Sequence, residues 1–139
     1  MPEDRFAETS YGRRGYNQPA VGLFNVRVAI RNPAQPDRQR ELDLLVDTGS
    51  LFTWVAAPIL EEIGIARAEA RQFRTVTGAF IERSIGYALV SHDSRTGVMN
   101  VVFGEPGDMD VLGATALESL SVTADPVQHV LVPIVSLAV

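Results

Sequence analysis

The stretch Leu44 to Val55, LLVDTGSLFTWV, places one carboxylate directly after three aliphatic residues and before a Thr-Gly-Ser turn. A carboxylate at the end of an apolar run is exposed, hydrogen-bonded, or retained because its altered affinity for protons is useful. Gly49 lets backbone amides approach Asp47, while Thr48 and Ser50 add hydroxyl groups. Such donors favour the ionised form, whereas a second carboxylate nearby forces the pair to share one proton. Two carboxylates in that state can act as general acid and general base.

Other residue types exclude several alternative chemistries. The chain has no cysteine, which rules out disulfides, thiolate catalysis and thiolate metal sites. Its two histidines, His92 and His129, lie far apart beside no matching carboxylate pattern, so we expect no metal site and no cofactor. The acidic residues Glu105, Asp108 and Asp110 lack the ligand spacing of a calcium loop, and we predict that they are solvated turn residues.

Composition and length limit the class of protein. All 12 basic residues are arginines, and 17 acidic residues give a net charge of -5, which disfavours binding to nucleic acid. No apolar run approaches the roughly 20 residues that span a bilayer, so we expect no membrane partner. Residues 1–18 are polar and lack the apolar segment of a secretory signal. We predict a flexible tail over 1–18, a single domain over 19–139, and a cytoplasmic location.

The remaining sequence predicts short strands separated by turns. In residues 22–30, apolar side chains alternate with mostly polar ones, which is typical of a half-buried strand. Turn-forming residues separate further expected strands, and two short apolar segments have helical character. The expected strands cover 22–30, 40–47, 51–56, 71–76, 79–92, 97–104, 109–113 and two segments within 122–137, and the helices cover 57–65 and 114–120. Because strands do not alternate with long helices, we predict a mainly antiparallel, closed β-barrel with one or two short helices.

These motifs together resemble the aspartic proteases, specifically the single-domain, retropepsin-like group that acts as homodimers. The match begins with Leu45 and Val46 and continues through the Asp-Thr-Gly-Ser turn into LFTWV. A second match is VLG, 111–113, followed by ATALESL, which is similar to the hydrophobic-hydrophobic-Gly element under the catalytic loop of that family. The Thr77-Gly78 hairpin stands where the family carries its flap. The resemblance covers residues 23–133.

The resemblance implies a role for each matched residue. Asp47 would be the catalytic carboxylate, Thr48 would bond to the partner subunit's loop, and Gly49 and Ser50 would bond the carboxylate oxygens. Only one such loop exists in the chain, so a second copy must supply the second aspartate across a two-fold axis. The expected substrate is a peptide or unfolded protein chain. Its expected contacts are Ser50, Thr77, Gly78, Ala79 and Phe80, and the expected supporting element is Val111, Leu112 and Gly113.

One departure from the family and several alternatives bear on this interpretation. Ala114 stands where retropepsins usually carry an arginine that supports the dimer, so we expect the apolar end, 131–139, to pair with its symmetry mate. The Asp47 turn could instead only terminate a strand, and Thr77-Gly78 could be an ordinary hairpin turn. Trp54 is expected in core or interface packing. The alternative function is a non-catalytic peptide-binding or scaffold module on the same barrel.

Overall fold

A computed structural model describes residues 23–138 of the chain. The tail predicted for residues 1–18 lies outside this range. Within the described range, no helix has the length and apolar character needed to cross a membrane.

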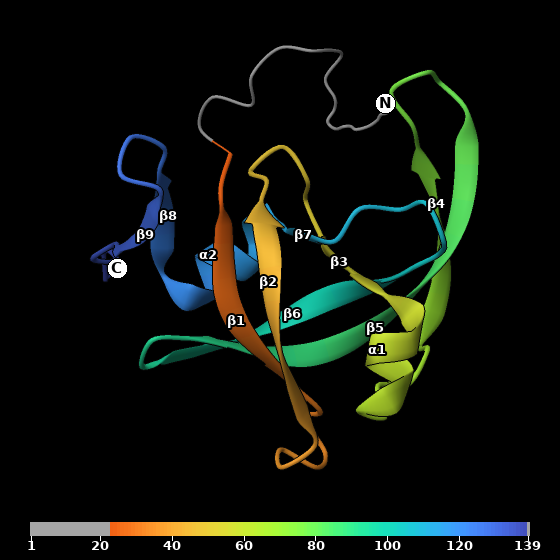
Figure 1. The fold of residues 1–139 in the computed structure, drawn as a ribbon, viewed down its shortest axis with the longest axis horizontal. Coiled ribbons are helices and arrows are strands. Elements are labelled where there is room, and N and C mark those ends of the chain that lie inside the picture. Colours follow the sequence, from red (N-terminus) through yellow and green to blue (C-terminus); the bar gives the residue numbers. More distant parts are fainter. Residues whose placement is uncertain (1–22, 139) are drawn as a thin grey trace.

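The described residues are mainly β and include two short helices, in close agreement with the predicted order of elements (Figure 1). The β4–β5 hairpin projects at one end of the molecule, and the short sheet of β8 and β9 lies at the other. The elements are β1 (Asn25–Arg31), β2 (Gln39–Val46), β3 (Thr53–Ala56), α1 (Ala57–Glu62), β4 (Glu69–Arg74), β5 (Phe80–His92), β6 (Arg95–Gly104), β7 (Val111–Leu112), α2 (Ala114–Leu120), β8 (Val122–Asp125) and β9 (Val130–Pro133).

Seven strands form one sheet in the order β1-β2-β7-β3-β6-β5-β4, and an additional pairing joins β1 to β5. Most neighbours are antiparallel, as the short turns predicted, but β2 pairs with β7 and β3 pairs with β6 in parallel. Each parallel pair joins strands far apart in sequence, because parallel neighbours need long connections. The pairing of β2 with β7 brings the Asp-Thr-Gly-Ser turn beside the Val-Leu-Gly element.

The core includes the alternating side chains that the sequence placed on one side of the first strand. Phe24, Val26, Val28 and Ile30 are all buried, whereas Arg27 is exposed. Helix α2 covers this core by packing against β6 and β8. Each fully buried aliphatic or aromatic side chain contributes about 1.5–3 kcal/mol to folding, so this alternation fixes which face of the strand turns inward.

The turns that connect the elements follow local chemistry. Pro58 lies in the first turn of α1, where a missing N–H costs nothing, and Gly64 follows the helix with φ of 79°. The β4–β5 hairpin closes through a hydrogen bond from the Gly78 N–H to the Thr75 carbonyl (2.9 Å), with Gly78 at φ 91°. The loop between β4 and β5 covers residues 75–79, so it is longer than the tight Thr77-Gly78 tip that the sequence predicts.

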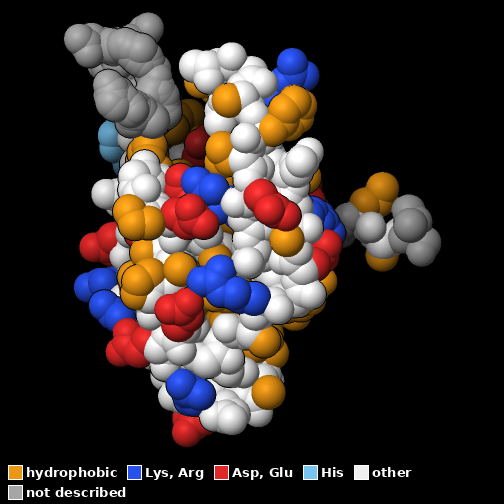
Figure 2. Space-filling model, turned by 90° about the vertical axis from the view of Figure 1, so that its right-hand side faces the viewer, with side chains coloured by type: hydrophobic (Ala, Val, Ile, Leu, Met, Phe, Trp, Pro, Cys, Tyr) orange, Lys and Arg blue, Asp and Glu red, His pale blue; other side chains and the backbone are white. Residues whose placement is uncertain are grey.

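Charged side chains of both signs share the surface. On the face that carries β4 and β5, acidic and basic groups lie next to one another (Figure 2). The pairs include Arg67 with Glu61 at 2.8 Å and Arg71 with Glu69 at 3.0 Å. This face therefore carries no extended patch of one sign such as a polyanion would require.

Candidate active site

Asp47 lies immediately after β2, where that strand meets β7. The Asp47 N–H donates to the Leu112 carbonyl (3.0 Å), extending the parallel pairing of Val46 with Leu112. Its own carbonyl accepts the Ser50 N–H (3.1 Å), which closes the turn. The backbone at Asp47 is thus fixed by one long-range and one local hydrogen bond, so its side chain leaves the sheet at a defined position.

The carboxylate of Asp47 is half-buried and accepts the Gly49 N–H at 3.0 Å through Oδ1. A Cβ at Gly49 would lie 3.3 Å from the same oxygen, so glycine gives the amide an unobstructed approach. Thr48 is exposed beside it. The turn therefore presents one hydrogen-bonded carboxylate that remains open to solvent, which a group that exchanges protons with water requires.

Ser50 differs from its predicted role within the chain. Its hydroxyl donates to the Phe52 carbonyl at 2.7 Å and not to the Asp47 carboxylate. Serine readily bonds a backbone group two residues away, and here this local bond takes the hydroxyl. Ser50 still supports the turn through its own N–H.

The Val-Leu-Gly element lies against the Asp47 turn. The resemblance of the two motifs to the aspartic proteases predicted this position. A Cβ on Gly113 would overlap the Phe52 carbonyl, so only glycine permits this approach. The Gly113 N–H donates to Oγ1 of the buried Thr53 at 3.0 Å. The Ala114 N–H donates to the Ser50 carbonyl at 2.8 Å. The first amides of α2 are therefore satisfied by the segment that follows Asp47.

A groove of about 560 Å³ opens beside the Asp47 turn. One side is the turn and the start of β3, the second is the β4–β5 hairpin, and the third is the loop between β6 and β7. Its lining is mostly apolar and comprises Asp47, Gly49, Ser50, Leu51, Phe52, Trp54, Phe73, Arg74, Thr75, Val76, Ile81, Gly107, Asp108, Met109 and Val111. A concave apolar site beside a few polar groups is the usual form of a ligand-binding cleft.

Three aromatic rings form one wall of the groove. Phe73 meets Phe52 edge to face, with centroids 6.2 Å apart, and meets Trp54 at 5.0 Å. The sequence predicted core or interface packing for Trp54, and the structure adds that it lines the groove. Sequence reasoning missed this cluster because Phe73 lies on β4, remote in sequence from Phe52 and Trp54.

The hairpin presents a different set of residues to the groove from the one predicted. Thr75, Val76 and Ile81 line it, whereas Thr77, Gly78, Ala79 and Phe80 do not. Cross-strand partners share a face, and Phe73 opposite Ile81 marks the groove face.

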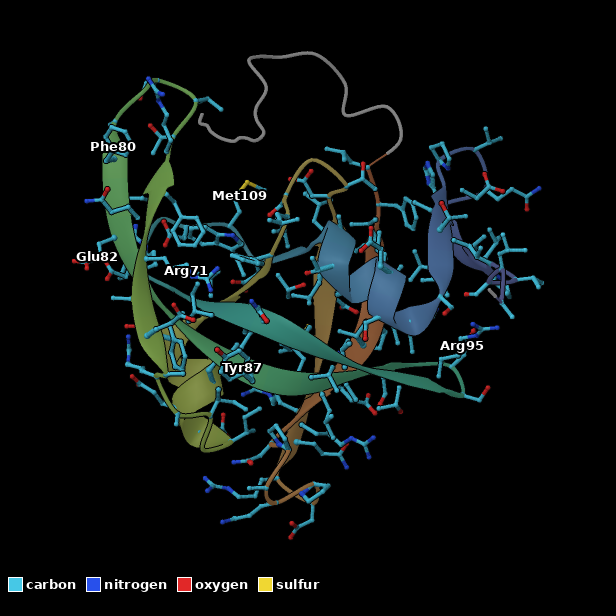
Figure 3. All side chains as sticks on the ribbon, turned by 180° about the vertical axis from the view of Figure 1, so that it is seen from behind. Arg71, Phe80, Glu82, Tyr87, Arg95 and Met109 are labelled. Atoms are coloured by element: carbon cyan, nitrogen blue, oxygen red, sulfur yellow. The ribbon has the colours of Figure 1, made fainter. Side chains whose placement is uncertain are left out.

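Phe80 is 64% exposed and belongs to the outer side of the hairpin. The guanidinium of Arg74, a residue that also lines the groove, lies 5.4 Å from its ring centroid. Figure 3 shows Glu82 on this outer side and Arg71 directed inward. An apolar contact with a chain bound in the groove is therefore available to Ile81 and not to Phe80 within one copy.

The prediction that Asp108 is a solvated turn residue is wrong. Its carboxylate accepts two hydrogen bonds from Arg83, at 2.7 Å from Nε and 3.0 Å from Nη2, and its side chain is only 17% exposed. The hydrogen bond to Asp108 raises the pKa of Arg83. The partner was not predictable because Arg83 lies on a strand remote in sequence.

Asp110 follows on the same loop and is exposed as a residue. Partial burial of its carboxyl group among neighbouring atoms raises the pKa of Asp110, while a backbone hydrogen bond from Ala56 acts in the opposite direction. Within residues 23–138, no group of three or more histidine and acidic side chains is placed to hold a metal ion.

No protein-family model matches the chain, and no curated protein matches it. Among solved structures, the chain is similar to the solution structure of Simian Foamy Virus (mac) protease. That match has 17% sequence identity and a TM-score of 0.48, and it covers 68% of this chain and 92% of the viral one. Function is therefore inferred from the geometry of the site itself.

Proposed function

We propose that the chain is one subunit of a retropepsin-like aspartic endopeptidase that works as a homodimer. The observation that carries this proposal is the Asp47 carboxylate, held by the Gly49 N–H at the edge of a largely apolar groove. The motif that supplies it is the one by which the sequence resembles aspartic proteases. The reaction is hydrolysis of a peptide bond by water, with no covalent enzyme intermediate.

A dimer is required because a single carboxylate cannot serve as base and acid in the same step. The chain has one Asp-Thr-Gly sequence, so a second copy brings the second Asp47 across a two-fold axis. Two carboxylates within hydrogen-bonding distance share one proton, because both cannot carry charge at that distance without a large repulsion. Thr48 is exposed next to Asp47, where its hydroxyl is available to the partner's turn.

The pair of Asp47 side chains performs both proton transfers. The ionised carboxylate takes a proton from a water molecule as the water oxygen bonds to the substrate carbonyl carbon. The protonated carboxyl gives its proton to the carbonyl oxygen, which forms a neutral gem-diol. The carboxyl that took the water proton then gives it to the amide nitrogen, while the other carboxylate takes a proton from a gem-diol hydroxyl. The C–N bond breaks, an amine and a carboxylic acid are released, and the pair again shares one proton. Activity should therefore require the state with one shared proton and fall on both sides of an acidic to mildly acidic optimum.

The groove indicates how a peptide would lie. An extended chain fits between the Asp47 turn and the β4–β5 hairpin, where its backbone can bond as an added strand. Leu51, Trp54, Phe73 and Met109 line this space with apolar surface. A peptide or unfolded chain with apolar side chains near the cleaved bond is the substrate class that this lining favours.

We also infer that the β1–β5 pairing closes the sheet of each subunit as a barrel.

The C-terminal segment is proposed as a dimer contact. Ala114 stands where the family usually carries an arginine that supports the dimer, so this segment would supply that support instead. Val135 is 95% exposed and Leu137 is 87% exposed. A segment that exposes several apolar side chains to solvent is suited to packing against a second copy.

The decisive experiment compares the wild type with Asp47→Asn on a peptide library from about pH 3 to pH 7. The wild type should cleave, and the variant should fall to background while it keeps its circular dichroism spectrum and still binds peptide. Asp43→Asn is the matched control, because Asp43 is an exposed acid on β2, the strand that leads to Asp47. Peptide binding by the wild type without cleavage at any pH would instead establish the non-catalytic peptide-binding or scaffold module.

A further inference from the structure

We propose that Arg83 is a positioning residue whose ion pair with Asp108 holds two sides of the groove together and sets its width. The inference deepens the proposed function, since it takes the groove to be the site where the peptide binds. It assigns a role in peptide binding to two residues that do not belong to the catalytic motif.

The pair is built to hold a fixed distance. Arg83 donates from Nε and Nη2 to the two oxygens of Asp108, and this two-point contact fixes orientation as well as separation. The side chains are 13% and 17% exposed, so solvent and salt screen the pair weakly. Exposed pairs elsewhere on the chain lack this shielding.

The two residues belong to different sides of the groove. Arg83 lies on β5, two positions from Ile81 on the same face of the hairpin. Asp108 lies between Gly107 and Met109, and these three residues line the groove from the loop between β6 and β7. Figure 1 shows this loop crossing the molecule to reach the hairpin. The ion pair therefore joins the hairpin to the loop at the corner of the groove.

Asp108 also organises the loop itself. Its Oδ2 accepts the Glu105 N–H at 2.7 Å, and its own N–H donates to the Glu105 carbonyl at 2.9 Å. Loss of the Arg83 side chain leaves both of these bonds in place. A variant at Arg83 should consequently release the loop from the hairpin without unfolding the loop, which separates positioning from local stability.

The test measures peptide binding without requiring turnover. In the full-length chain carrying Asp47→Asn, the fluorescence of Trp54, the single tryptophan and a residue of the groove wall, reports binding of an apolar library peptide. Arg83→Met should weaken binding by about tenfold, a size common for coupled neighbouring residues. The peptide affinity of Arg83→Lys should lie between that of the chain with Arg83 intact and that of Arg83→Met, because an ammonium keeps the charge but cannot form the planar two-point contact.

Two further readouts distinguish positioning from a general loss of stability. In the active enzyme, Arg83→Met should raise KM with little change in kcat. Hydrogen exchange should become faster at the hairpin tip and in the loop, and Arg83→Met combined with Asp108→Asn should bind no more weakly than the weaker single variant. The control is Arg40→Met, which removes an exposed pair with Glu62 (2.6 Å) between β2 and α1.

Specific outcomes would overturn the inference. Unchanged exchange in both the hairpin and the loop of folded Arg83→Met would show that the pair does not hold the groove together, whether or not a peptide binds. An equal loss of affinity in Arg40→Met would show a nonspecific effect. Failure of the protease assignment would look different, because cleavage would be absent in the wild type while the exchange difference at Arg83 persisted.

Discussion

Replacement of Thr53 by valine removes a side-chain hydrogen bond that links β3 to the Val-Leu-Gly element. Thr53 is fully buried, and its Oγ1 accepts the Gly113 N–H at 3.0 Å. Valine has nearly the same shape, so the backbone can keep its path while the Gly113 amide loses its partner. Because this amide lies between the Asp47 turn and α2, its loss of a partner should destabilise the candidate active site directly.

The size of the effect follows from two opposing contributions. A buried N–H without an acceptor costs about 1–3 kcal/mol. The methyl group that replaces the hydroxyl returns at most about 0.8 kcal/mol of apolar burial. We expect Thr53→Val to lower the free energy of unfolding by about 1–2 kcal/mol, which leaves a domain of ordinary stability folded.

Urea unfolding followed by circular dichroism measures this change, at one fixed protein concentration because a dimer's stability depends on concentration. With a slope of about 1–2 kcal/mol per molar, the midpoint should fall by about 1 M. Hydrogen exchange at the Gly113 amide gives the local readout. Thr53→Ser is the control, since it loses a methyl group but keeps the acceptor and should leave the exchange of that amide slow.

An unchanged midpoint together with unchanged exchange at Gly113 in Thr53→Val would refute the reasoning. That result would mean that the amide finds another acceptor, and that the hydroxyl does not couple the strand to the Val-Leu-Gly element. Faster exchange at Gly113 in Thr53→Ser as well would also count against it, because the acceptor is still present there.

Asp110→Asn and removal of the C-terminal segment test two other parts of the structure. Burial raises the folded-state pKa of Asp110, so its protonated form contributes stability that is complete below the ordinary aspartate pKa and is lost as pH rises through the raised value. As pH rises above the ordinary pKa of aspartate, the unfolding midpoint of the wild type should decline, and Asp110→Asn should make this decline shallower. A steeper decline in the variant would contradict this. A chain ending at Ile134 lacks the exposed Val135 and Leu137, so its mass in solution should shift toward the monomer, whereas an unchanged dimer would exclude the segment from the interface.

The order of strands and helices was predictable from the sequence because it rests on local physical chemistry. Alternation in the first strand placed Phe24 and Ile30 on the buried side, and both are buried. Pro58 and Gly64 marked the limits of α1 through their backbone preferences. The Asp47 turn was also predictable, since the bond from Gly49 joins atoms only two residues apart.

The sequence by itself therefore determined the elements and the chemical group at the centre of the candidate site. Tertiary structure alone decided what surrounds that group: Trp54 beside Phe73, and Arg83 paired with Asp108 across 25 positions of the chain. Both contacts depend on how strands distant in sequence align in the sheet. No local pattern encodes such an alignment, because side chains from different strands meet only after the register is fixed by burial of the whole core.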